Sequence, residues 1–302
     1  MFKFLPAILF AIATSVQAAA TTCPEHFYGG AAPDVLIAGL RARTYALCHT
    51  AYAAETSGVT KTGIWSAEHL TRDAVLAAHH VGRVDDFRAD LSVPPRDRAE
   101  LSDYRGNGLN LDRGHLSPSG DAASAQAQDE TFLMSQMVPQ SHENNSGLWE
   151  ELEYMTRLMA QRDGEVYVVT GPAFVGTQLR QIGSGVYVPT HMWKAEYSPQ
   201  RGAGVYVARN APGYGYSVLS VAQFIQFGGI DPFPALAPAI KNVVGNMPRP
   251  RADGLYIEPV SLGGLAAADA GVAEQSASGR PNRPRYGLGY HGTAGAGARV
   301  WQ

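Results

Sequence analysis

Three stretches of the chain carry apolar residues in the pattern of β-strands. The stretch 63–70 (GIWSAEHL) alternates its two faces, and 165–171 (EVYVVTG) and 187–197 (YVPTHMWKAEY) are typical of strands buried in a core. Pro172 and Pro189 mark the edges or ends of the latter two, because proline lacks the backbone donor that a central strand needs. These segments predict a β-sheet.

One long helical pattern lies between these strands. A first stripe of apolar residues recurs at helical spacing, namely Leu148, Leu152, Met155 and Met159. A second stripe at steps of four has its centre about 110° from the first and holds Asn145, Trp149, Glu153 and Arg157. The segment 33–54 predicts a helix that leads into a strand. Strands on both sides of a central helix indicate an α+β protein with a mixed or antiparallel sheet core and flanking helices.

The N-terminus has the three parts of a secretory signal peptide. Lys3 precedes the apolar run FLPAILFAIATSV, and small residues surround position 17. The run is shorter than the about 20 apolar residues that cross a bilayer, so no membrane span is expected in the mature protein. We predict a signal peptide at 1–18, one domain at 19–262, and a flexible tail rich in Ala, Gly, Pro and Arg at 263–302. The predicted location is secreted or periplasmic.

Composition restricts the expected partners. The chain has 302 residues, 45% of them hydrophobic, and its formal charge is 24 minus 27, or −3. A protein of this charge binds a polyanion only through a local basic patch. The polar segment 84–105, which Pro94 and Pro95 exclude from regular helix, is either a solvated loop or a source of positive potential through its arginines at 88, 96, 98 and 105.

Cys23 and Cys48 lie close behind the predicted signal peptide. Two thiols 25 positions apart without a CxxC pair are poor metal ligands, and a disulfide between them is the favoured interpretation. On the chain-entropy model such a bridge stabilises by roughly 3 kcal/mol.

His115 stands in a polar, glycine-containing segment that we predict to be a turn. An imidazole has an ordinary pKa of about 6.5, so part of it is neutral at about pH 7 and able to take a proton from water. The second helical stripe offers an amide, a carboxylate and a guanidinium, the groups that a metal and a phosphate need. Two ordinary interpretations compete: a hydrogen-bonded structural histidine, and a surface Glu–Arg pair worth a few tenths of a kcal/mol.

Several motifs occur in a fixed order around these residues. They are DYRGNGLNLDRGHLSPSGD, TFLMSQMVPQ and NNSGLWEELE, and they resemble the DNA/RNA non-specific endonuclease family, the ββα-metal or His-Me finger nucleases. The family signature DRGH matches residues 112–115, and the spacing to the Pro-Gln and Asn-x-x-x-Trp-x-x-x-Glu elements also fits. Looser similarity extends over 47–197. The resemblance implies a ββα-metal active-site motif.

The resemblance also implies roles for individual residues. His115 would be the general base, and Asn145 the one direct protein ligand of Mg²⁺, for which Mn²⁺ or another divalent cation can substitute. Glu153 would hold metal-bound water. Arg113 and Arg157 would contact the scissile phosphate or stabilise its transition state. The products of DNA and RNA cleavage would carry 5′-phosphate and 3′-hydroxyl ends.

Two further substrate contacts are implied by looser matches. Arg88 matches an upstream phosphate-contacting arginine of the family. Gln136 stands where the family commonly has Asn, which keeps the amide and lengthens its reach.

Two other functions compete with the nuclease. A zinc hydrolase built on His79-His80 or His142-Glu143 lacks the HExxH spacing. A secreted nucleic-acid-binding or DNA-uptake protein without catalysis, a degenerate nuclease, is supported by Gln136 and the acidic balance. The sequence leaves open a homodimer, an inhibitor protein and the preference between DNA and RNA.

Overall fold

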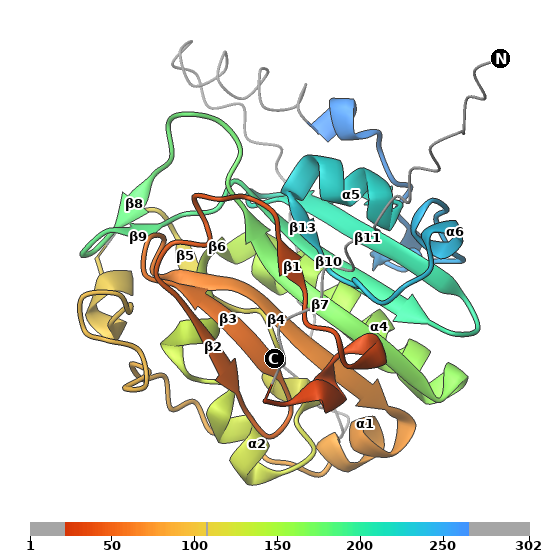
Figure 1. Cartoon of the computed structure of the whole chain (residues 1–302), viewed down its shortest axis with the longest axis horizontal. Coiled ribbons are helices and arrows are strands. Elements are labelled where there is room, and N and C mark those ends of the chain that lie inside the picture. Colours follow the sequence, from red (N-terminus) through yellow and green to blue (C-terminus); the bar gives the residue numbers. More distant parts are fainter. Residues whose placement is uncertain (1–21, 107, 266–302) are drawn as a thin grey trace, which may run out of the picture.

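The structure, a computed structural model, describes residues 22–106 and 108–265, so the predicted signal peptide and nearly all of the predicted tail lie outside the described residues. A seven-stranded antiparallel sheet runs through the centre in the order β12-β11-β10-β7-β4-β3-β2 (Figure 1). The α+β prediction is confirmed. The strands are β2 (Thr44–Cys48), β3 (Ala53–Ser57), β4 (Thr62–Thr71), β7 (Glu165–Ala173), β10 (His191–Ser198), β11 (Gly202–Arg209) and β12 (Tyr216–Leu219).

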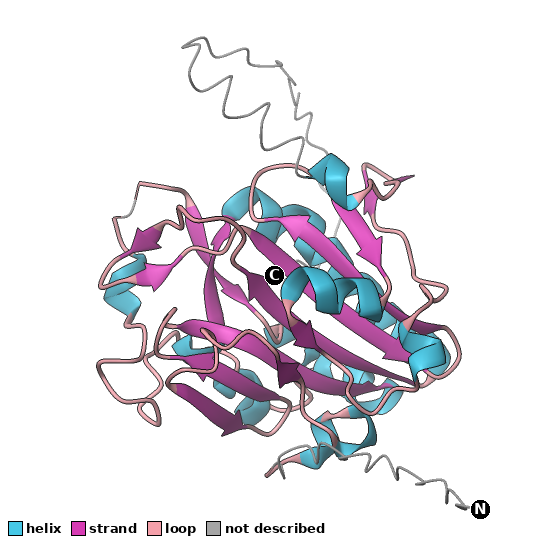
Figure 2. Ribbon diagram, turned by 45° about the horizontal axis from the view of Figure 1, so that its top comes forward, coloured by secondary structure: helices cyan, strands magenta, loops and turns pink. Residues whose placement is uncertain are grey.

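Helices cover both faces of this sheet (Figure 2). The alternation of β10 shows why: Trp193 packs with Phe224 of α5 (Val221–Gly228), whereas the next side chain along the strand, Met192, packs with Leu152 of α4 (Glu150–Asp163). The α4 face also buries polar side chains, among them Lys194 and Glu196, each 1% exposed. Buried polar groups are costly unless they are hydrogen-bonded, and here Lys194 donates to Thr170 while Glu196 accepts from Thr156.

A second, two-stranded sheet leads into the long helix. β5 (Leu111–His115) pairs antiparallel with β6 (Met137–Ser141), and β6 continues directly into α3 (His142–Asn144), a π-helical turn η6 (Asn145–Trp149) and then α4. This strand–strand–helix unit is the predicted ββα motif. His115 is the last residue of β5 and not part of a turn, because the DRGH segment pairs with the residues that precede the helix.

Sequence periodicity was wrong for the segment 33–54. In place of a helix it contains β1 (Asp34–Val35), turns and the strand β2, while β1 pairs with β13 (Ile230–Asp231). Alanine and leucine are strong helix formers, but helix propensity is small compared with tertiary contacts, and strand pairing with distant segments overrides it here. The stretch 187–197 is also two strands, β9 (Val186–Tyr187) and β10, because Pro189 interrupts it. The segment 84–105 is mainly irregular, as expected, with a 3-10 turn η3 (Leu101–Tyr104).

The remaining elements are short and lie around this framework. They are η1 (Pro24–His26), η2 (Tyr28–Gly30), α1 (Arg72–Ala78), η4 (Ser119–Asp121), α2 (Ala125–Glu130), η5 (Met134–Gln136), β8 (Gln181–Ile182), α6 (Pro238–Lys241), β14 (Arg251–Ala252) and β15 (Leu255–Tyr256). Among the described helices, none is long and apolar enough to cross a membrane.

The two cysteines are free thiols, so the predicted disulfide is not present in the structure. Their side chains nevertheless meet: burial, followed by a hydrogen bond with Cys48, raises the pKa of the Cys23 thiol to about 12. The N-terminal segment therefore contacts the end of β2 at the two sulfur atoms.

Candidate active site

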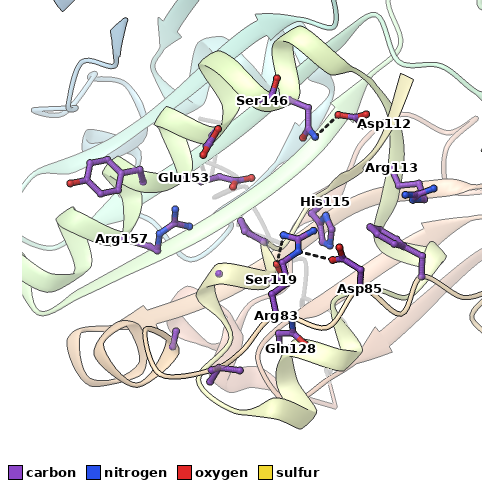
Figure 3. Close-up of a pocket in the computed structure, with 18 of the residues that line it drawn as sticks. Arg83, Asp85, Asp112, Arg113, His115, Ser119, Gln128, Ser146, Glu153 and Arg157 are labelled. Atoms are coloured by element: carbon purple, nitrogen blue, oxygen red, sulfur yellow. Dashed lines mark hydrogen bonds and ion pairs between the residues drawn. The ribbon is translucent and has the colours of Figure 1, made fainter. Parts of the chain in front are cut away.

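A cavity of about 520 Å³ opens beside the ββα unit. It brings together His115 and Arg113 from β5, Asn145 from the π-helical turn, and Glu153 and Arg157 from α4. Figure 3 shows His115, Arg113, Glu153 and Arg157 around this space. Five of the seven residues expected at the site therefore line one cavity, although they come from segments far apart in the sequence.

The imidazole of His115 is held between two aromatic rings. Its ring centroid lies 5.6 Å from that of Phe87 and 5.2 Å from that of Phe132, both in edge-on geometry. Its Nε2 is buried and has no hydrogen-bond partner among the described residues. Burial, then the charges of Arg83 and Arg113, lower the pKa of His115 to about 3. The imidazole is therefore neutral at physiological pH, which is the state a base requires.

Gly114 of the DRGH segment stands where there is no room for a side chain. A Cβ at Gly114 would lie 2.1 Å from Oε1 and 2.6 Å from Cβ of Gln140, on the paired strand β6. Nε2 of Gln140 in turn donates to Oδ1 of Asn144, 2.9 Å away, at the end of α3. The missing side chain thus leaves room for the amide that fixes the start of the helix carrying Asn145.

We expect Gly114→Ala to lower the free energy of unfolding by about 1–3 kcal/mol, since an added methyl must displace the buried Gln140. Denaturant unfolding measures the change. Gly82→Ala is the matched control, because a Cβ there meets nothing within 4 Å, and a surface change of that kind stays within about 0.5 kcal/mol. Equal stability of the two variants would show that Gln140 moves aside without cost.

Asn145 has an amide held in one orientation. Its Nδ2 donates to Oδ2 of Asp112 over 2.9 Å, and Nδ1 of His142 lies 3.0 Å from the same oxygen. Asp112 raises the pKa of His142, through the hydrogen bond first and its charge second. Because the amide NH₂ is occupied, Oδ1 of Asn145 is the atom left for a hard cation.

The donor set around the cavity fits such a cation. Mg²⁺ takes oxygen ligands and keeps several waters, so one amide oxygen with substrate phosphate oxygens suffices. Zinc needs a different arrangement, and the described residues contain no cluster of three or more His, Cys, Asp or Glu that could hold a metal ion.

The π-helical turn changes the expected helical stripe. Trp149 was placed with Asn145, Glu153 and Arg157, but its side chain is fully buried and packs in the core with Leu152. A π-helical turn winds more residues into each turn than an α-helix, so steps of four no longer keep one face. The apolar stripe is confirmed, since all four of its members are buried: Leu148, Leu152, Met155 and Met159.

The floor of the cavity holds paired charges. Nη1 of Arg157 donates to Oδ1 of Asp121 at 2.8 Å, and the Asp121 side chain is 2% exposed. Burial raises the pKa of Glu153 to about 7, and the charges of Lys194 and Arg157 limit the rise. Arg157 is thereby fixed for contact with an anion, and Glu153 changes charge near neutral pH.

Arg83 lines the cavity and was missed by sequence reasoning. Its Nε donates to Asp85 at 2.6 Å and its Nη1 to Oγ of Ser119 at 2.9 Å, so the guanidinium is fixed next to His115 (Figure 3). Arg83 stands one residue before the polar segment 84–105 whose arginines were considered. No sequence pattern around Arg83 indicates that it lies beside His115.

Two residues expected to contact the substrate lie away from the cavity. Arg88 is directed to Asp129, with Nη2 2.6 Å from Oδ2, and does not line the cavity. Gln136 is fully buried, where its Oε1 accepts from the backbone N–H of Ser117 at 2.7 Å and its Nε2 donates to backbone oxygens of Ser117 and Thr131. Gln136 therefore holds the loop that follows His115.

The other arginines of the polar segment do not reach the cavity either. Arg96 pairs with Asp97 at 3.3 Å and Arg98 with Glu100 at 2.7 Å. The segment is a packed surface loop and is not solvated throughout, because Asp97 is fully buried and the Arg98 side chain is only 16% exposed.

An antiparallel sheet joined to a ββα unit, with a histidine and an asparagine on one cavity, defines the class of ββα-metal nucleases. The model of the family described as DNA/RNA non-specific endonuclease matches residues 35–233, and the chain belongs to this family. A related solved structure is described as the EndoG/EndoGI complex and the mechanism of EndoG inhibition. It is 25% identical, has a TM-score of 0.54, and the match covers 61% of this chain and 84% of that one.

Curated relatives extend the comparison. The mitochondrial nuclease EXOG of Danio rerio is 36% identical over 200 residues, which are 58% of this chain and 57% of the relative. Nuclease C1 of Cunninghamella echinulata var. echinulata is 38% identical over 148 residues, 45% and 58% of the two chains. Human mitochondrial endonuclease G is 35% identical over 192 residues, 58% and 61%. The chain thus matches between 57% and 61% of the length of these relatives.

These relatives overturn the predicted location. EXOG and endonuclease G are mitochondrial, as is the mitochondrial nuclease of Saccharomyces cerevisiae, which is 34% identical over 149 residues. The prediction of a secreted or periplasmic protein, made from the N-terminal apolar run, is therefore wrong.

Proposed function

We propose that this protein is a metal-dependent endonuclease that hydrolyses phosphodiester bonds of DNA and RNA. The observation that carries the proposal is the neutral imidazole of His115, with a buried Nε2 that lacks a partner among the described residues, on the same cavity as the oriented amide of Asn145. A base and a cation ligand beside one space are what hydrolysis of a phosphodiester requires.

In this mechanism the imidazole of His115, which lines the cavity, takes a proton from the attacking water. Arg83, Arg113 and Arg157 donate to the phosphate oxygens, for which the planar guanidinium fork is well matched. The phenyl ring of Phe87 supports Arg113, whose guanidinium carbon lies 4.1 Å from the ring centroid. Mg²⁺, with Mn²⁺ or another divalent cation as a substitute, held by Asn145 would neutralise the charge that develops on the phosphate and on the leaving 3′-oxygen.

Glu153 would accept hydrogen bonds from water bound to the cation. The products would carry 5′-phosphate and 3′-hydroxyl ends. The site contacts backbone phosphate and carries no base-reading group in this scheme. Such contacts position the nucleic acid without reading its sequence, so both DNA and RNA are substrates.

A nucleic-acid-binding protein without catalysis is the alternative. Two features supported it, namely Gln136 in place of the family's Asn and the acidic balance. Gln136 hydrogen-bonds to the backbone of Ser117 and has a structural role, so it no longer counts against catalysis. Plasmid nicking separates the two functions. We expect cleavage with Mg²⁺ and none with a chelator, whereas binding without cleavage under both conditions would favour the alternative.

We expect the cleavage rate to fall as the pH drops below about 7, because Glu153, whose pKa is raised to about 7 by burial, then becomes protonated and neutral. His115 does not cause this loss, since its pKa of about 3 keeps it neutral over the same range. A pH profile of kcat at fixed Mg²⁺ measures the effect. Glu153→Gln should be slower and lack the acid limb, and an unchanged limb in that variant would assign the limb to another group.

A further inference from the structure

A short hairpin beyond the family-matched residues 35–233 lies beside the cavity. Its strands β14 and β15 pair antiparallel around Asp253 and Gly254, whose φ angles of 50° and 78° are both positive. This is the two-residue hairpin turn that Asp-Gly favours. The hairpin is therefore a defined element and not an irregular end.

Two buried tyrosines fasten this hairpin to the central sheet. The hydroxyl of Tyr206 on β11 donates to the backbone oxygen of Pro248 over 2.6 Å, and that of Tyr216 on β12 donates to the oxygen of Ile257 over 2.8 Å. Both side chains belong to the core beneath α4. Moving either end of the hairpin away would leave a buried tyrosine hydroxyl without a partner, so both ends are held in place.

The hairpin contacts α4 next to residues that line the cavity. The backbone N–H of Arg251 donates to Oε1 of Glu151 over 3.2 Å, in the first turn of α4. The neighbouring residue Glu150 and the 50% exposed Tyr154 both line the cavity. Tyr154 and Glu150 therefore connect the cavity to the surface of α4 that the hairpin contacts.

The exposed face of the hairpin carries an aromatic ring and two guanidinium groups. Tyr256 is 54% exposed, and the guanidinium carbons of Arg251 and Arg249 lie 4.2 Å and 5.2 Å from its ring centroid. Arg251 also donates to the hydroxyl of Tyr256. Arg249 pairs with Glu258, but both side chains are more than half exposed, and such surface pairs contribute little. A phosphate can replace that carboxylate.

We propose that Tyr154, Arg249, Arg251 and Tyr256, here called the rim strip, bind a single-stranded stretch of DNA or RNA adjacent to the phosphate in the cavity. The inference rests on the proposed function. Arginine offers charge to the backbone and a flat face to a base, and exposed aromatic rings stack bases whatever their sequence. A duplex hides these base faces. Because the whole chain has a formal charge of −3, local groups of this kind are needed to attract a polyanion.

The test measures binding without hydrolysis, in full-length protein carrying His115→Ala. The probe is a fluorescein-labelled single-stranded DNA of about 20 nucleotides, and its anisotropy is followed over a range of salt concentrations. Adding Arg249→Gln and Arg251→Gln together should weaken binding about tenfold. It should also lower the slope of log K against log salt by about 1.4, which is 0.7 for each lost phosphate contact. Tyr256→Leu should weaken binding about tenfold through lost stacking.

One further variant separates charge from stacking, and a second is a control. Arg251→Lys keeps the charge and loses the flat guanidinium, so the salt slope should stay while affinity falls. Arg180→Gln, at an exposed arginine outside the rim strip, should change neither. Thermal melting of each variant verifies the fold.

The rim strip is refuted if folded Arg249→Gln/Arg251→Gln protein keeps the affinity and salt slope of its parent, or if the loss is as large for a duplex as for the single strand. These outcomes are independent of catalysis. Wild-type protein that never cleaves with a divalent cation refutes the nuclease alone, while normal cleavage with unchanged binding by the strip variants refutes the strip alone.

Discussion

His115→Ala should reduce the cleavage rate on plasmid DNA by at least about a hundredfold, because a positioned general base contributes about 10²–10⁴ to the rate. The fold should survive, since Nε2 of His115 makes no hydrogen bond to other described residues. Initial rates of nicking in saturating Mg²⁺ measure the loss. Binding of the DNA should change little, so the effect appears in kcat and not in KM.

A matched control and a chemical rescue make this test specific. His80→Ala removes an exposed histidine that does not line the cavity, and it should cleave as the wild type does. Added imidazole should partly restore cleavage to His115→Gly, because the small base enters the space vacated in the cavity. Full activity of His115→Ala, or an equal loss in His80→Ala, would contradict the role of His115 as the base.

The sequence predicted the fold class correctly, but apolar periodicity misjudged single elements. The ordered motifs located His115, Asn145 and Glu153, because chemistry at a phosphodiester demands particular residue types at fixed spacing. The helix expected over 33–54 is absent, because the pairing of β1 with β13 joins residues about 195 positions apart, which no local pattern reveals. Apolar periodicity reports local preference, and long-range pairing overrides it.

Contacts and local geometry that sequence spacing does not show explain why some site residues differ from the expectation. Arg88 and Gln136 were predicted as substrate contacts from looser matches to the family, but Arg88 pairs with Asp129 and Gln136 bonds to the backbone of Ser117. Arg83 reaches the cavity only because the loop that carries it folds back onto Ser119, a contact across 36 residues. Trp149 left the expected stripe at a π-helical turn, whose extra width sequence spacing does not show. The Asp-Gly pair at 253–254, by contrast, was a local signal that could have predicted the hairpin.

Asn145→Ala should weaken the binding of a divalent cation and slow cleavage by more than about a hundredfold, since even partners that only orient a metal ligand are worth about 10–100-fold. Asp112, whose Oδ2 accepts from Nδ2 of Asn145, is such a partner, so Asp112→Ala should lose about 10–100-fold and recover partly as Mg²⁺ is raised.

Calorimetric titration with Mn²⁺, without nucleic acid, gives a readout separate from activity. Asn145→Asp keeps an oxygen ligand and should bind Mn²⁺, whereas Asn145→Ala should not. Asn242→Ala, at an exposed asparagine after α6, is the control and should behave as wild type. If Asn145→Ala bound Mn²⁺ as tightly as the control, the cation would be held by other oxygens of the cavity. Asp112 and Glu153 would then be the carboxylates to test, because both line that cavity and carboxylate oxygen is a ligand that Mg²⁺ and Mn²⁺ share.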